Sequence, residues 1–263
     1  MQRVRIRYAK RGRLRFTSHR DFARAFERAL RRAAVPMAYS AGFSPHPKVS
    51  YVGAAPTGVA SEAEYLEIGL SAAVDVERLG AALDASLPPG LDVLECVEAR
   101  RGRGGLADRV DASAWRVELP GVEVAALEAA VAAFLDRAEV QVERLTKDGR
   151  RLLDARAPVV CAVVGASPGG AGEPCAILDL VVRQVTPAVR PDDVLAALRA
   201  VAGFAPAVPP RATRLAQGRL DGRGRLADPL APDRAAVVPA TEAVDAPRPA
   251  EQAAPFVGYT PAS

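Results

Sequence analysis

Arginines near the N-terminus are the residues whose type and spacing point most directly to chemistry. Six of them fall within nineteen residues: Arg13, Arg15, Arg20, Arg24, Arg28 and Arg31. A guanidinium group is permanently charged and can donate two parallel hydrogen bonds to one phosphate. The last four recur every three or four residues, which places a charge about every 6 Å along one side of a helix. We therefore expect this segment to bind the phosphates of a polyanion.

The loop at residues 39–48, with the sequence YSAGFSPHPK, is a second candidate for a site. Two prolines fix the backbone on either side of His46, and Lys48 follows. Rigid loops that carry a titratable group are often binding sites, so we expect His46 and Lys48 to contact the same ligand as the arginines. A catalytic alternative is a metal-independent ribonuclease with His19 and His46 as general base and acid and Lys48 as an electrostatic stabiliser. For His19, an exposed place in the first turn of a helix is the simpler interpretation.

Metal ligands are scarce in this chain. It has two histidines, and Cys96, Cys161 and Cys175 are widely separated. No CxxC pair offers the local geometry of a zinc or iron–sulfur site. We expect no metal ion and no cofactor, and we interpret the cysteines as core thiols.

The net charge of +4 is distributed unevenly along the chain. Residues 1–50 contain thirteen Lys and Arg against two acidic side chains, a local net charge of +11, and the remaining 213 residues have a net charge of −7. This asymmetry favours an anionic partner for the N-terminal part. No apolar run reaches the ~18 residues of a membrane helix, and the basic N-terminus is not followed by an apolar stretch. We therefore expect a soluble, cytoplasmic protein.

The elements that must position these residues can be predicted from periodicity. Residues 3–8 alternate strictly, which indicates a strand with Arg3, Arg5 and Arg7 on one solvated face, adding to the basic surface. Ser18 is a good N-cap for a helix that runs to about Ala34. Strands are expected at 49–53, 64–70 and 91–98, and a second helix at 76–86. This order, β-α-β-β-α-β, is typical of the ferredoxin-like fold.

The rest of the chain repeats that order less clearly. Strands are expected at 115–119, 140–145, 159–164, 177–184 and 212–216, with helices at 122–138 and 191–202. We predict an α+β protein with two ferredoxin-like lobes in tandem. The predicted boundaries are a basic lobe at 1–99, an exposed linker at 100–110, a second lobe at 111–217 and a disordered Pro- and Ala-rich tail at 218–263.

Two smaller expectations concern the first lobe. Glu62, Glu64 and Glu67 are expected to pair with nearby arginines rather than to act as catalysts. Ferredoxin-like sheets often stack single-stranded bases on exposed aromatics, and the candidates in this lobe are Tyr8, Tyr39, Tyr51 and Tyr65.

The run GRLRFTSHRDFARAFERALRRAAVPMAYSAGFSPHPKVSY, followed by PTGVASEAEYLEI, resembles the DUF2344 family of radical SAM-associated proteins. The resemblance is specific over residues 3–70 and continues weakly to about residue 216. It implies a partner, a radical SAM enzyme, rather than a reaction. The chain lacks the CxxxCxxC motif that would ligate a radical SAM cluster, so another protein would have to supply that chemistry.

Three hypotheses follow for the function. The first is an RNA-binding accessory module that works with a radical SAM enzyme or an RNA-processing system and has no free-standing catalytic activity. The second is the ribonuclease described above. The third is an interaction adaptor whose basic face docks an acidic surface of a radical SAM partner.

Overall fold

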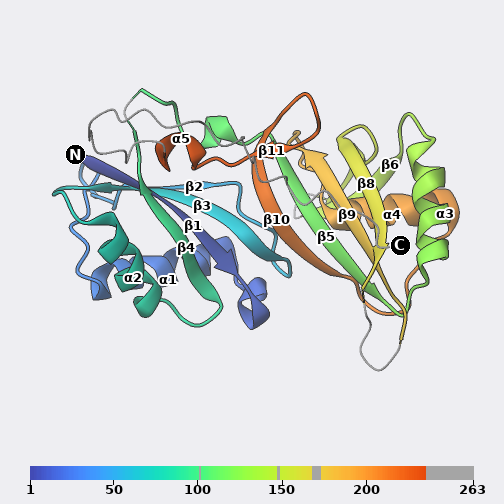
Figure 1. Ribbon diagram of the computed structural model, residues 1–263, viewed down its shortest axis with the longest axis horizontal. Coiled ribbons are helices and arrows are strands. Elements are labelled where there is room, and N and C mark those ends of the chain that lie inside the picture. The colour runs from blue at the N-terminus through green and yellow to red at the C-terminus, as the bar shows by residue number, and fades with distance from the viewer. Residues whose placement is uncertain (101, 147–148, 168–172, 235–263) are drawn as a thin grey trace, which may run out of the picture.

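The computed structural model describes residues 1–100, 102–146, 149–167 and 173–234, and it is a mixed α+β structure built on one large sheet. Its first half forms one end of that sheet, on the left of Figure 1. The elements of this half are β1 (Gln2–Lys10), η1 (Gly12–Phe16), α1 (His19–Arg32), β2 (Val49–Val52), β3 (Ala60–Leu70), α2 (Val76–Ser86) and β4 (Leu91–Glu98). Strand β1 lies between β3 and β4 and is antiparallel to both, and β2 pairs antiparallel with the other edge of β3.

The second half repeats this arrangement with one insertion. Its elements are η2 (Ala107–Arg109), β5 (Ala112–Pro120), α3 (Val124–Leu135), β6 (Gln141–Thr146), β7 (Gly149–Asp154), β8 (Val159–Ala166), β9 (Cys175–Arg183), α4 (Pro191–Ala202) and β10 (Arg211–Leu220). Strand β5 lies between β9 and β10, and β8 pairs with the outer edge of β9. The inserted β6–β7 hairpin forms a separate two-stranded sheet, so the strand expected at 140–145 does not join the main sheet.

The two halves meet where β10 lies beside β3, and the main sheet runs continuously in the order β4-β1-β3-β10-β5-β9-β8. In Figure 1, α1 and α2 lie below the first half of the sheet, while α3 and α4 lie beside the second half. Each helix pair covers its own apolar core. Phe26, Leu66 and Leu83 are central to the first core, and Phe134 and Leu178 are central to the second. Burying a side chain of this size contributes roughly 1.5–3 kcal/mol.

The outer edge of β3 is shared between two strands. Its residues 65–68 pair with β2, while residues 60–61 pair in parallel with β10. Ala63 lies between the two ladders, and its backbone is satisfied by side chains instead: its carbonyl accepts from Gln217 Nε2 at 2.6 Å, and its N–H donates to Ser61 Oγ at 3.2 Å. The chain thus avoids leaving buried backbone groups unpaired.

A buried ion pair joins the halves at the same place. Arg214 of β10 donates to Glu64 of β3, and the side chains of both are less than 5% exposed. The other carboxylate oxygen of Glu64 accepts from the backbone N–H of Ala55 at 3.1 Å. Lys10 Nζ donates to the carbonyls of Ala55 and Pro56, each at 3.2 Å. Because breaking a buried pair leaves a charge without compensation, the Arg214–Glu64 pair fixes the second half against the first.

The segment predicted as an exposed linker is partly buried. Leu106 and Val110 pack with Tyr65 against the face of the first sheet that is opposite to α1 and α2. No apolar periodicity marks this packing in the glycine- and arginine-rich stretch at 100–110, which is why the sequence did not predict it.

The prediction of a disordered tail from residue 218 is wrong for residues 218–234. Strand β10 continues to Leu220, and β11 (Leu226–Ala227) and α5 (Ala231–Arg234) follow. Leu230 is fully buried against Tyr65, on the same face of the first sheet as Leu106; Figure 1 shows α5 above this sheet, across from α1 and α2. Residues 235–263 lie outside the described residues.

None of the helices in the described part of the chain is both long enough and apolar enough to cross a membrane.

Candidate nucleic-acid interface

Helix α1 holds the arginines in place through its opposite face. The Ser18 hydroxyl caps the helix by accepting from the Asp21 backbone N–H at 3.2 Å, as the sequence predicted. Phe22, Phe26 and Leu30 are buried against the sheet, each no more than 3% exposed. This fixes the rotation of the helix about its axis, so the charged side chains must face outward.

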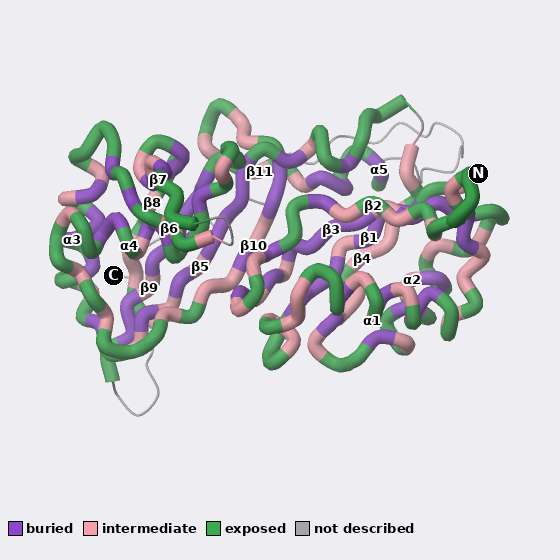
Figure 2. Tube along the Cα trace, turned by 180° about the vertical axis from the view of Figure 1, so that it is seen from behind, coloured by how far each residue is buried: buried purple, intermediate pink, exposed green. Residues whose placement is uncertain are grey.

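All five arginines of α1 are exposed: Arg20, Arg24, Arg28, Arg31 and Arg32. Figure 2 shows α1 on the outside of the molecule, with exposed and buried stretches alternating along it. Within the part of the chain that the structure describes, none of these five forms an ion pair or a side-chain hydrogen bond. The two acidic residues of the helix do not pair with these arginines. Asp21 accepts from the Ser18 hydroxyl, and Glu27 is close enough to Tyr51 to raise the pKa of the tyrosine.

The short helix η1 extends the basic surface beyond the N-terminal end of α1. Arg13 is exposed. Arg15 is half-buried, and its guanidinium lies 4.7 Å from the centre of the Phe16 ring in a cation–π contact. Neither arginine forms an ion pair among the residues that the structure describes. The Phe16 ring is 58% exposed, so an aromatic surface adjoins the charges here.

The loop at residues 39–48 is closed at its base by backbone contacts. Tyr39 and Pro47 form a bridge across its base. Above the base, Ser40 donates its backbone N–H to the His46 carbonyl at 2.9 Å and accepts from the His46 N–H through its hydroxyl at 3.0 Å. His46 and Lys48 are exposed. Phe43, at the tip, is fully exposed with a relative accessibility of 111%.

The two histidines lie near opposite ends of β2. The His19 ring meets Tyr51 edge-on, with ring centres 4.8 Å apart. His46 precedes the strand and lies beyond Lys48, which pairs with Gly69 near the far end of β3. From Pro47 to Tyr51 the chain is extended for four residues, roughly 13 Å at a rise of about 3.3 Å per residue. The structure therefore does not bring His19 and His46 together as an acid–base pair.

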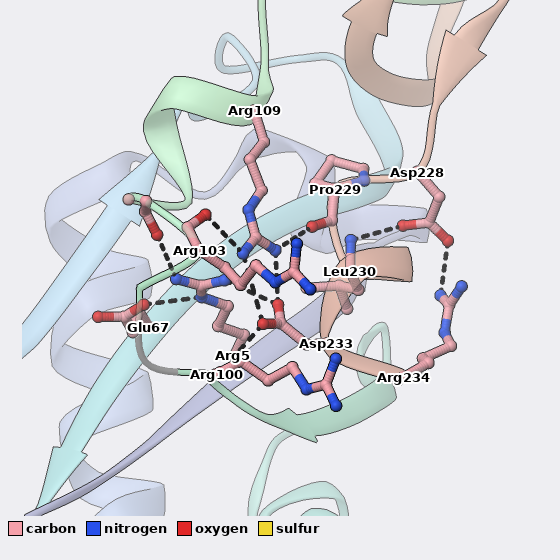
Figure 3. A network of polar contacts seen from close by, with 12 residues as sticks. Arg5, Glu67, Arg100, Arg103, Arg109, Asp228, Pro229, Leu230, Asp233 and Arg234 are labelled. Carbon is pink, nitrogen blue, oxygen red and sulfur yellow. Dashed lines mark hydrogen bonds and ion pairs between the residues drawn. The ribbon is translucent and has the colours of Figure 1, made fainter. Parts of the chain in front are cut away.

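Arg3, Arg5 and Arg7 do not form the solvated cationic face that strand alternation predicted. Arg5 is 1% exposed. It donates to Glu67 at 2.8 Å and to Asp233 at 2.7 Å, two residues labelled in Figure 3. It also donates to the Gly104 carbonyl at 2.8 Å. Alternation predicts which residues share a face. The segments that cover this face, residues 102–110 and 226–234, are distant in the sequence, and no pattern within β1 indicates them.

Asp233 is the centre of this covered network (Figure 3). Its carboxylate accepts from Arg109 at 2.6 Å, from Arg5, and from the Arg100 backbone N–H at 3.1 Å. Burial alone would raise the pKa of Asp233, but these hydrogen bonds outweigh it and hold the pKa below its ordinary value. The network is therefore a charged structural contact and not a free basic surface.

The expected pairing of the three glutamates is confirmed. Glu62 pairs with Arg11, Glu64 with Arg214, and Glu67 with Arg5. Their carboxylates are committed to internal contacts.

The sheet tyrosines are unsuited to stacking on bases. Tyr8 and Tyr65 are buried, and Tyr51 is half-buried. Burial raises the pKa of both Tyr51 and Tyr65 to about 12. The exposed rings are instead Phe16, Phe43 and Tyr39, the last of which is 55% exposed. Phe16 and Phe43 were not predicted from the sequence as candidates for base stacking. Phe43 could have been identified, because a phenylalanine between a glycine and a Ser-Pro step in a polar loop is expected to be exposed.

In the described ranges, no three His, Cys, Asp or Glu side chains are grouped so that they could hold a metal ion. Cys161 is exposed, contrary to the prediction that the cysteines are core thiols, while Cys96 is half-buried and Cys175 is buried.

Comparison with known proteins identifies the family. Residues 3–191 match the family described as "Uncharacterized protein conserved in bacteria (DUF2344)". Since this range is well over half of the chain, the protein belongs to that family. No curated protein matches the chain.

Two solved structures are similar to this chain at low identity. One is an unknown protein from Galdieria sulphuraria, at 15% identity, covering 81% of this chain and 98% of that one, with a TM-score of 0.24. The other is DyPB from Rhodococcus jostii RHA1, at 12% identity, covering 82% and 90%, with a TM-score of 0.22. Neither score is high enough to establish a shared fold.

Proposed function

We propose that this member of the DUF2344 family is a non-catalytic RNA-binding module whose contact surface is the outer side of α1 together with η1 and the loop at 39–48. The observation that carries the proposal is the set of arginines in η1 and α1 that have no acidic partner in the described structure: Arg13, Arg15, Arg20, Arg24, Arg28, Arg31 and Arg32. Elsewhere in the same half, Arg3, Arg5 and Arg11 are neutralised by carboxylates, Arg7 donates to the Glu62 carbonyl, and the exposed Arg78 is isolated from the row on η1 and α1 in sequence.

An unpaired row of like charges is unfavourable without a ligand. Arginines four residues apart on a helix destabilise it by roughly 0.2–0.5 kcal/mol per pair. Arg20, Arg24, Arg28 and Arg32 form three such pairs. A phosphate backbone removes this repulsion and is matched by the bidentate geometry of the guanidinium, so the surface is more stable with a polyanion bound than without one.

The exposed aromatic rings favour RNA with unpaired bases over a duplex. Single-stranded nucleic acids are held by a basic groove combined with aromatic side chains on which bases stack. Phe16 and Phe43 are exposed in η1 and in the 39–48 loop. In a duplex each base is stacked on its neighbours and has no free face for a phenylalanine ring. These two residues would therefore contribute only to the binding of unpaired bases.

The fold supports this proposal at the level of topology. In both halves a central strand is flanked by two antiparallel strands, and a further strand pairs with one of those: β4-β1-β3-β2 in the first half and β10-β5-β9-β8 in the second. This is the strand order of a βαββαβ unit, and we interpret the halves as tandem ferredoxin-like lobes, a class that often binds RNA.

A second candidate is the adaptor role, in which the same surface docks an acidic face of a radical SAM enzyme. Exposed aromatics among arginines favour it, because protein interfaces are enriched in both residue types. We place it second, since an adaptor needs no continuous row of charges. In either case the radical SAM enzyme is the proposed partner, and the proposed location is cytoplasmic.

Binding measurements across a salt series test the proposal. The nuclease-treated protein is titrated with tRNA, an unstructured single-stranded RNA and a duplex DNA. We expect the single-stranded RNA to bind most tightly, with an affinity that falls steeply with salt. For single strands, each phosphate contact contributes about 0.7 to the slope of log affinity against log salt concentration. Replacing Arg24 and Arg28 by Gln should therefore reduce this slope by about 1.4. At about 0.1 M salt this corresponds to a loss of roughly 25-fold.

The matched control changes two exposed arginines of the second half, Arg137→Gln and Arg199→Gln, which have no ion pair in the described structure. This control should bind RNA as the parent does. Equal affinity for the parent and the Arg24/Arg28 variant would refute the proposed surface. RNase-resistant binding to a radical SAM protein that is lost in the same variant would favour the adaptor.

A further inference from the structure

A small pocket lies beside the shared edge of β3, at the junction of the two halves. Its volume is about 280 Å³. Its walls are the turn at 53–56 after β2, Ser113 and Trp115 of β5, Val182 and Arg183 at the end of β9, residues 184–185 and 188–190 between β9 and α4, and Arg214 of β10. It lies near the place where β2 and β10 pair with different parts of β3.

The glycine at the rim is required by this packing. Gly53 has a φ of +48°, and a Cβ atom there would lie 2.8 Å from Gln217 Oε1. Gln217 cannot withdraw easily, because its amide nitrogen is bonded to the Ala63 carbonyl. The turn thus lies directly on the buried polar network, and the pocket wall is rigid on this side.

The lining is cationic and contains no acidic residue. The charge of Arg214 is neutralised by Glu64. Arg183 and Arg190 are exposed, and in the part of the chain that the structure describes neither guanidinium has an ion-pair partner. Gln184 and Ser113 add neutral hydrogen-bonding groups, while Trp115 and Val189 make part of the wall apolar.

We propose that this pocket binds a phosphomonoester, carried either by the end of an RNA chain or by a free nucleotide. Two free guanidinium groups match a dianion, and near neutral pH a phosphomonoester is close to a dianion, whereas an internal phosphodiester carries one charge. The volume is near the lower limit for ligand pockets, which suits one terminal group rather than a continuous chain.

The pocket also lies close to the surface proposed for RNA. Tyr51, whose ring contacts His19 in the first turn of α1, is two residues before Gly53 at the pocket rim. Two extended residues span roughly 7 Å. The pocket rim is thus close to the N-terminal end of α1. That an RNA bound along α1 places its end at this pocket is part of the inference, which to this extent rests on the proposed function.

The test compares one short unstructured RNA in three forms: with a 5′-phosphate, with a 3′-phosphate, and with hydroxyls at both ends. Adenosine monophosphate is titrated separately as the free nucleotide. The variant is Arg183→Gln with Arg190→Gln, and the control is Arg199→Gln, an exposed arginine farther along α4 and outside the pocket. Because both pocket arginines are exposed, thermal unfolding should be unchanged in either variant.

We expect one terminal phosphate to tighten RNA binding by roughly tenfold or more. The pocket variant should lose this gain but keep the affinity of the hydroxyl form, and the control should keep both. If RNA binds in a salt-dependent manner and neither terminal phosphate nor the free nucleotide makes a difference, the pocket proposal is overturned while the RNA surface stands. If the nucleotide binds through Arg183 and Arg190 but no RNA does, the pocket stands with a free nucleotide as its ligand, and the RNA function fails.

Discussion

Replacing Asp233 by Asn tests whether the C-terminal segment is an integral part of the first half. The carboxylate of Asp233 is fully buried and pairs with Arg5 and Arg109, whose side chains are 2% and 11% exposed. Asn keeps the size of the side chain and removes its charge. Arg5 would keep its ion pair with Glu67. Its 2.7 Å contact with residue 233 would change from an ion pair to a hydrogen bond with an uncharged amide.

The expected loss of stability follows from the burial of these groups. Removing one partner of a buried ion pair costs about 3–5 kcal/mol, because the remaining charge is left without compensation. For a chain of this length each kcal/mol lowers the melting temperature by roughly 2–4 °C. We therefore expect Asp233→Asn to melt about 6–20 °C below the parent when unfolding is followed by circular dichroism.

The difference should depend on pH in a defined direction. Since the pKa of Asp233 is held below its ordinary value in the folded protein, the carboxylate contributes stability above the unfolded pKa of about 3.9. That contribution is lost as the pH falls through the folded pKa. The free energies of unfolding of the parent and of Asp233→Asn should thus differ by a constant amount near neutral pH and converge below about pH 4.

Asp179→Asn is the control, because Asp179 also accepts two hydrogen bonds from one arginine, Arg116, but on a partly exposed surface. An exposed pair contributes at most about 1 kcal/mol, so this variant should melt within a few degrees of the parent. If Asp233→Asn is no less stable than this control, the ionic network does not hold the C-terminal segment on the sheet, and the apolar contact of Leu230 with Tyr65 alone would have to do so.

Three other substitutions have definite expected outcomes. Phe43→Ala should weaken binding of single-stranded RNA by about 1–3 kcal/mol and leave stability unchanged, since the ring is fully exposed; an unchanged titration would remove Phe43 from the proposed surface. Gly53→Ala should destabilise the protein by roughly 1–3 kcal/mol in urea unfolding, because its Cβ would press on Gln217 at a φ of +48°, and a neutral effect would contradict the rigid rim. Ala34→Gly should raise the melting temperature by about 2–4 °C, because Ala34 has a φ of +49° after the end of α1; a lower melting temperature would show that the flexibility added by glycine outweighs the strain it relieves.

Local signals in the sequence predicted most elements of the fold. Alternation located β1, the serine cap located the start of α1, and the predicted limits of α2, β4 and α4 agree with the structure at 76–86, 91–98 and 191–202. Contacts between distant segments could not be predicted in this way. The strand β7 was missed because RRLLDA does not alternate, and its hairpin leaves Leu145 and Leu152 exposed.

In the candidate site, too, local features were predicted and contacts between distant segments were not. That Arg20, Arg24 and Arg28 are exposed follows from one helix and its apolar stripe, so the sequence predicted it correctly. That Arg5 is buried depends on Asp233, which is 228 residues away, and no periodicity within β1 reports on it. The separation of His19 from His46 likewise depends on the direction in which β2 leaves the loop, and not on their spacing in the chain.

The ion pairs also change how the N-terminal charge should be interpreted. The acidic partners of Arg3, Arg5 and Arg11 come from β3, β4 and α5, outside residues 1–50, so the local net charge overstates what is available to a ligand. The available charge is concentrated on η1 and α1. Neutralising Arg5 would lower both stability and any RNA affinity, whereas neutralising Arg24 should change stability by no more than about 0.5 kcal/mol. Only substitutions of the second kind separate binding from folding, and a loss of RNA affinity confined to them would assign the charge of this segment to its ligand.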